Sequence, residues 1–109
     1  MADKILLVQG DTLPTPVVTI YDEISGETVD LTGASVRMLF RESGSTTLKA
    51  TLTGVLIGTP PGSTGQVVFS FGNTLDTPGN YEGEFEVTFP SGGIQTTYAT
   101  QKFKVREQF

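Results

Sequence analysis

Apolar and polar side chains alternate through residues 80–89 of this chain. The odd-numbered positions of this segment form one face, which carries Tyr81, Gly83, Phe85, Val87 and Phe89. The even-numbered positions carry Asn80, three glutamates and a threonine. Successive side chains of a β-strand point to opposite faces of a sheet, so this pattern predicts a strand with one buried and one solvated face. No segment shows a helical repeat of apolar residues, and the chain is therefore predicted to be all-β.

Shorter segments of the same kind recur along the chain, separated by turns rich in Gly, Pro, Asp and Ser. Those before residue 80 cover residues 4–9, 17–21, 35–41, 48–53, 55–57 and 66–71, with a kink expected at Gly54. A chain of 109 residues is predicted to form a single domain, residues 1–109. The strand spacing, together with 13 Gly and 6 Pro, predicts an antiparallel sandwich or barrel of about seven to eight strands.

The end of the chain predicts an interruption between two strands. After a hairpin turn at residues 90–93, the inward side chains are expected at even positions, namely Ile94, Thr96 and Tyr98. Farther along, the inward side chains are Phe103 and Val105, at odd positions. A change of parity requires one extra residue, so a β-bulge or a break in the strand is predicted near Ala99–Gln101.

Tyr81 has two interpretations, a structural one and a chemical one. In immunoglobulin-like sandwiches, a Tyr at the start of a late strand hydrogen-bonds to the backbone a few residues upstream, an arrangement called the tyrosine corner. The order Asp76, Gly79 and Tyr81, an acidic turn followed by a glycine and the Tyr, fits this corner. A chemical role would need a neighbouring base, and the chain contains no histidine. The prediction is a structural corner in an immunoglobulin-like antiparallel β-sandwich.

The composition disfavours most chemical functions. The chain has no cysteine and no histidine, and its 12 carboxylates against 7 basic residues give a net charge of −5. Binding to a phosphate backbone needs clustered Lys and Arg, so no nucleic-acid partner is expected. The segment Gly58–Gly65 lacks the Lys of a phosphate-binding loop and is interpreted as a hairpin tip. No enzyme activity, cofactor, bound metal or small-molecule substrate is expected.

Two groups of carboxylates have a metal-binding alternative. Glu82, Glu84 and Glu86 share one face of a strand, where same-side residues lie about 6.5–7 Å apart and converge poorly on one ion. Cross-strand pairing with Lys102 and Lys104 is predicted for them instead. The carboxylates of the loops would have to gather around Ca²⁺ without the spacing of an EF-hand loop. They are Asp22, Glu23, Asp30 and Asp76.

The first predicted strand is apolar on both faces. It contains Ile5, Leu6, Leu7 and Val8, a run too short to span a membrane. An apolar strand at the edge of a sheet has little to prevent it from pairing with another chain. Two interpretations stay open: another sheet of the same domain covers the strand, or a partner subunit does. These four residues are the candidate partner-contact strand.

Three segments carry a resemblance to a known family. They are QGDTLP (Gln9–Pro14), VDLTGASVRMLFR (Val29–Arg41), and the elements GQVVFSF and DTPGNYEGEFEVTFPSGG within Gly65–Gly93. With these segments in this order and at these distances, the chain resembles the N-terminal immunoglobulin-like domain of phage baseplate upper proteins. The resemblance covers most of the chain, and it implies a fold and a setting in a virion rather than a catalytic residue.

The function that the resemblance implies is a non-enzymatic structural or interaction module of a bacteriophage or prophage virion, in the tail baseplate or tail tip. Its partners would be other phage structural proteins and further copies of itself, assembled in the cytoplasm of the bacterial host. A receptor- or carbohydrate-binding module is an alternative, with Tyr21 and Tyr98 as the plausible aromatic platforms. A capsid decoration domain is a further alternative, whose sequence would look no different.

Overall fold

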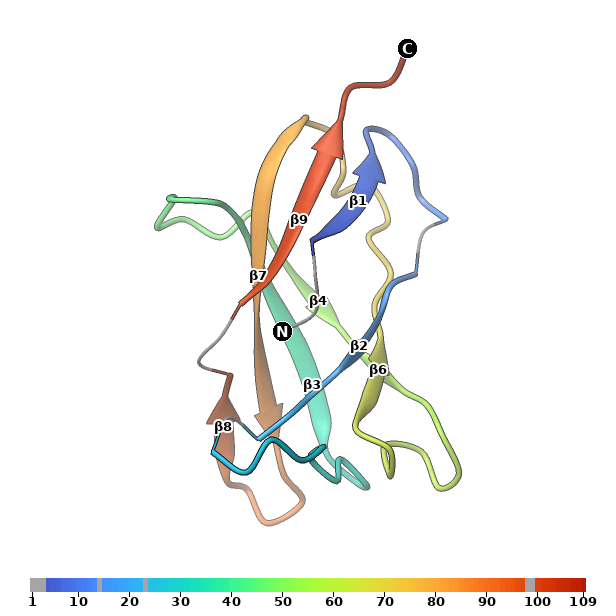
Figure 1. The fold of residues 1–109 in the computed structure, drawn as a ribbon, viewed down its shortest axis with the longest axis vertical. Helices are drawn as coiled ribbons and strands as arrows, with labels where there is room; N and C mark the ends of the chain where they lie inside the picture. The colour runs from blue at the N-terminus through green and yellow to red at the C-terminus, as the bar shows by residue number, and fades with distance from the viewer. Residues whose placement is uncertain (1–3, 14, 23, 98–99) are drawn as a thin grey trace.

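The computed structural model describes residues 4–13, 15–22, 24–97 and 100–109 (Figure 1). This part of the chain contains nine β-strands and no helix, so the all-β prediction is confirmed. The strands are β1 (Ile5–Val8), β2 (Val17–Thr19), β3 (Ser35–Glu42), β4 (Ala50–Thr53), β5 (Val55–Leu56), β6 (Gln66–Val68), β7 (Gly79–Thr88), β8 (Ile94–Thr96) and β9 (Gln101–Arg106).

The strands form two sheets that pack as a sandwich. The larger sheet has the order β1-β9-β7-β3-β4, with β8 also paired to β7, and the smaller sheet has the order β2-β6-β5. Every strand pair is antiparallel except β1–β9, which is parallel. The expectation of a purely antiparallel sandwich is therefore wrong at one edge. A parallel pair needs a long connection, which the first and last strands of a chain have.

The kink predicted at Gly54 separates β4 from β5, which belong to different sheets. This change of sheet brings the count to nine strands, more than the predicted seven to eight. A Cβ atom at Gly54 would collide with the side chain of Val67 and would lie 3.0 Å from the ring of Phe69. The chain crosses between the sheets here because a glycine can pass this close to the core.

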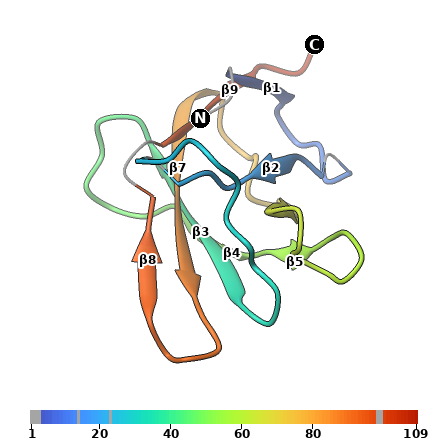
Figure 2. The same cartoon turned by 60° about the horizontal axis from the view of Figure 1, so that its bottom comes forward.

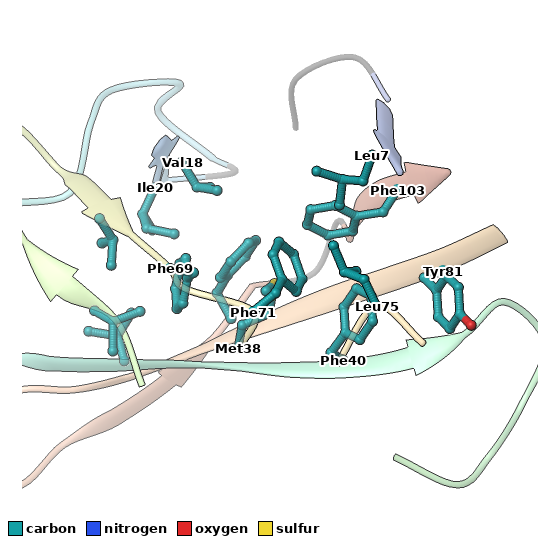
Figure 3. Close-up of a cluster of buried hydrophobic side chains, with 14 of the residues drawn as sticks. Leu7, Val18, Ile20, Met38, Phe40, Phe69, Phe71, Leu75, Tyr81 and Phe103 are labelled. Carbon is teal, nitrogen blue, oxygen red and sulfur yellow. The ribbon is translucent and has the colours of Figure 1, made fainter. Parts of the chain in front are cut away.

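The core lies between the two sheets, and aromatic rings occupy its centre (Figure 3). The ring of Phe40 stacks on Tyr81 with centroids 5.0 Å apart, and it meets Phe71 and Phe103 edge-on at 5.3 and 5.4 Å. The alternation predicted the inward faces of the long strands correctly. Their buried apolar side chains are Val36, Met38, Phe40, Tyr81, Phe85, Val87, Phe103 and Val105.

The return strand differs from the prediction. Ile94 is 66% exposed, whereas Thr97 is buried and holds Phe85 through two hydrogen bonds, one of them from the Phe85 N–H to its Oγ1 at 3.2 Å. The inward positions are therefore odd on both sides of the interruption, and the predicted change of parity is wrong. A threonine can face inward here because its hydroxyl finds a backbone partner. The β8 strand is exposed throughout, and Figure 2 shows it on the side of the larger sheet away from β2 and β5.

The register between β7 and its two neighbours explains the interruption. Glu86 pairs with Thr96 of β8, and Gly83 pairs with Gln101 of β9, so the register moves by two residues between the two pairs. A shift of two residues preserves the side-chain faces, whereas the predicted bulge of one residue would exchange them. Tyr98 and Ala99 of the predicted bulge lie outside the described residues.

Candidate functional site

Tyr81 lies at the start of β7 and makes the hydrogen bond expected of a tyrosine corner. Its hydroxyl donates to the carbonyl oxygen of Thr77, 2.7 Å away, and its ring is almost fully buried against Phe40. Burial raises the pKa of the Tyr81 hydroxyl. The group therefore stays protonated and acts as a donor, whereas a nucleophile would need the opposite shift.

Asp76 connects the corner to two other parts of the fold. Its carboxylate accepts a hydrogen bond from the Lys49 ammonium at 2.6 Å, and its backbone carbonyl accepts one from Gln9 Nε2 at 3.0 Å. The ammonium of Lys49 lowers the pKa of Asp76. Because this pair is largely in solvent, it adds little to stability. Gly79, the third predicted residue of the corner, begins β7 with φ +149°.

Replacing Tyr81 with Phe is expected to lower the free energy of unfolding by about 1–2 kcal/mol, because the partly buried Thr77 carbonyl loses its donor while the ring packing is kept. Urea denaturation measures the change. Tyr21→Phe is the matched control, since Tyr21 is 46% exposed, and it should leave the midpoint unchanged. Equal midpoints for the Tyr81 variant and the wild type would show that the hydrogen bond contributes nothing.

The outward face of the larger sheet carries a network of ion pairs. Glu82 accepts from Arg41 and from Lys102, each at 2.6 Å, and Glu86 pairs with Arg37 at 2.8 Å. The predicted pairing of Glu82 with Lys102 is confirmed. Lys104 instead lies opposite Asn80, so its predicted pairing with a glutamate is wrong.

Two partners in this network were missed by the sequence reasoning. Arg37 and Arg41 belong to β3, which neighbours β7 although the two strands are far apart in the chain. Local alternation gives the face of each residue but not the identity of the neighbouring strand. The ammonium of Lys102 and then the guanidinium of Arg41 hold the pKa of Glu82 below its usual range.

Replacing Glu82 with Gln is expected to lower the free energy of unfolding at pH 7 by about 1–2 kcal/mol, since two cations lose their shared acceptor. A carboxylate whose pKa is lowered by folding stabilises the protein above its unfolded pKa, about 4.3, and loses this contribution as the pH falls through its folded pKa. The difference between wild type and variant should therefore shrink below about pH 4. Urea unfolding across this range measures it.

Glu84→Gln is the matched control for this experiment. Glu84 lies on the same face of the same strand, and within the described ranges it forms no ion pair. Its variant should have wild-type stability at pH 7. Equal losses in both variants would contradict a specific role of the Glu82 network.

The loop carboxylates do not gather. Asp22 accepts from the amides of Ile24 and Ser25, Asp30 accepts from Thr32, and Asp76 pairs with Lys49. Glu23 lies outside the described residues. Among the residues that the structure describes, no three acidic side chains form a group able to hold a metal ion.

The four residues of β1 divide between the two faces of the larger sheet. Leu7 is buried in the core beside Phe103 (Figure 3), and Ile5 is partly buried and packs against the same core. Leu6 points to the outward face, where it is 74% exposed, and Val8 is half-buried there. The sandwich therefore covers the inner face of the strand and leaves the outer one open. The inner face fits the interpretation that another sheet of the same domain covers the strand, and the outer face is the one that a partner subunit could cover.

The β1 strand is also the last strand of its sheet, and a shallow hollow lies over it. The hollow has a volume of about 290 Å³ and is lined by Leu6, Leu7, Val8, Lys104 and Arg106. The two basic residues come from β9, which lies beside β1 (Figure 1). Sequence reasoning did not join them to the site, because nothing local in the sequence predicts that the first and last strands are neighbours.

These features define a class of protein: a small all-β sandwich with one open and partly apolar sheet edge. No protein-family model matches the chain, and a comparison with curated proteins finds no match. Within the described part of the chain, no helix has the length and apolar character needed to cross a membrane.

Proposed function

We propose that this chain is a non-enzymatic interaction module of a bacteriophage or prophage virion, located in the tail baseplate or tail tip. The observation that carries the proposal is the open β1 edge, with Leu6 exposed beside an apolar hollow. An exposed apolar edge promotes aggregation unless a partner covers it. The partners are other virion proteins and further copies of the chain, assembled in the cytoplasm of the bacterial host.

The strand pairing supports an immunoglobulin-like type of sandwich. In such domains, strands C, F and G form one sheet, and strands B, E and D belong to the other. Here β3, β7 and β9 are adjacent in the larger sheet, and β2, β6 and β5 form the smaller one. The tyrosine corner of immunoglobulin-like domains lies at the start of strand F, which corresponds to Tyr81 at the start of β7. Two of the segments that carry the resemblance to baseplate upper proteins, Val29–Arg41 and Gly65–Gly93, contain most of β3 and all of β6 and β7.

Mass spectrometry of purified phage particles from the producing strain, followed by antibody labelling in electron micrographs, tests the proposal. The expected result is the protein in the particles and the label at the tail tip. Label on the head would support a capsid decoration domain instead. Absence of the protein from the particles would overturn the proposal.

Isothermal titration against glycans of the host cell wall separates the structural role from carbohydrate binding. A structural module should release no heat. Of the two aromatic platforms predicted for the alternative, Tyr21 is 46% exposed and Tyr98 lies outside the described residues. Heat that disappears in a Tyr21→Ala variant would favour the carbohydrate-binding alternative.

A further inference from the structure

The β1 edge presents backbone groups as well as apolar side chains. The N–H of Gln9 donates to the carbonyl oxygen of Arg106 at 2.9 Å, which shows that the peptide groups of Gln9 point toward β9. Peptide groups of alternate residues point to opposite sides of a strand, so Ile5 and Leu7 face β9. The peptide groups of Leu6 and Val8 therefore point away from the sheet. The Val8 carbonyl accepts from the Asp11 N–H at 3.2 Å. Within the described part of the chain no other strand pairs with this side of β1, so both backbone groups of Leu6 and the N–H of Val8 lie at the open edge.

We infer that this edge accepts an extended segment of a partner protein in which apolar and acidic side chains alternate. This inference rests on the proposed function, because an assembly module needs such a partner. The added segment would extend the larger sheet by one strand and would pair with the free groups of Leu6 and Val8. Its inward side chains would continue the apolar row of Ile5 and Leu7, and its outward ones would lie beside Leu6 and Val8.

The charge at this edge favours an acidic partner. Lys104 and Arg106 lie on the outward face directly opposite Leu6 and Val8. Among the residues that the structure describes, neither cation has a carboxylate within 4.0 Å, although the chain as a whole carries a net charge of −5. Lys102, one step earlier on β9, is neutralised by Glu82. The guanidinium of Arg106 lies over the ring of Phe109 and donates to the carbonyl oxygen of Glu107 at 2.9 Å, and both of these partners are uncharged. Lys104 and Arg106 therefore keep positive charge beside the apolar hollow.

The spacing of the strands makes glutamate the suitable acidic residue. An added strand would lie two strand spacings, about 9–10 Å, from Lys104 and Arg106. Extended Glu and Lys side chains together bridge such a gap. The methylene groups of the glutamate would then cover Leu6 and fill the hollow of about 290 Å³.

A second copy of the chain fits this edge less well. Two β1 strands paired across a two-fold axis would bring four unmatched cations to one joint sheet. A partner segment that brings its own carboxylates avoids this accumulation of positive charge.

Binding of a short blocked peptide of alternating Val and Glu residues tests the inference, with amide chemical shifts of the whole protein followed by NMR. The control is a peptide of the same length in which Lys replaces Glu. The expected result is a set of shift changes confined to β1 and β9, and an affinity of the Val–Glu peptide about fivefold higher than that of the Val–Lys control. A Lys104→Glu and Arg106→Glu double variant should reverse this preference. Both residues are exposed, so the fold should be kept.

A pair of single variants locates the site. Leu6→Glu should weaken binding of the Val–Glu peptide, whereas Val55→Glu, at an exposed apolar strand position in the other sheet, should leave it unchanged. Equal affinity for both peptides, shift changes elsewhere, or no binding of either peptide would overturn the inference. Changes at β1 that depend on protein concentration without peptide would assign the edge to a second copy. Peptide binding does not depend on where the protein lies in a particle, so failure here leaves the labelling result intact.

Discussion

Replacing Phe40 with Ala is expected to lower the free energy of unfolding by about 3–5 kcal/mol. Phe40 is fully buried at the centre of the core, where its ring contacts the rings of Phe71, Tyr81 and Phe103. Truncation leaves a cavity and removes three aromatic contacts, each favourable beyond its buried area. Small domains are stable by only about 5–15 kcal/mol, so the variant loses a large share of the total.

Thermal unfolding followed by circular dichroism measures this effect, and a decrease in Tm of more than about 12 °C is expected. Leu39→Ala is the matched control, because Leu39 is the next residue back on β3 and points to the half-exposed outward face. It should cost about 1 kcal/mol or less. Similar decreases in both variants would contradict a core centred on Phe40.

The faces of the long strands could be predicted because the information is local. In β3 and β7, apolar residues recur at every second position, and only one orientation of each strand buries all of them. The observed burial patterns of both strands follow this orientation. Thr97 is an exception to this alternation, also for a local reason. Its hydroxyl accepts a hydrogen bond from the Phe85 N–H, so this polar group has a partner inside the domain as it would in solvent, and its polarity did not predict which face the side chain occupies.

The partners of each strand could not be predicted in the same way. The pairing of Ile5 with Phe103 joins the two ends of the chain, and no short-range pattern encodes it. For this reason the sequence indicated the apolar strand as a candidate site but not the cations that accompany it. Lys104 was expected to neutralise a glutamate, whereas the register places it beside Leu6.

Replacing Gly62 with Ala is expected to lower the free energy of unfolding by about 2–4 kcal/mol, from a backbone term and a packing term. The hairpin tip between β5 and β6 folds back onto the core, and Leu31 donates its N–H to the Gly62 carbonyl at 2.9 Å. Gly62 has φ +88°, a left-handed conformation that costs an L-residue about 1–2 kcal/mol. An added Cβ would lie 2.8 Å from the backbone of fully buried Leu31, so the loop or Leu31 must move.

Gly44→Ala separates the two terms. Gly44 has nearly the same φ, +86°, but a Cβ atom there would meet nothing within 4 Å. This variant should therefore lose only the backbone term, about 1–2 kcal/mol, and the excess loss in the Gly62 variant measures the packing of the loop on Leu31. Urea denaturation of both variants gives the comparison. Equal losses would mean that the loop moves away from Leu31 without cost, and the close approach would then contribute nothing to the stability of the fold.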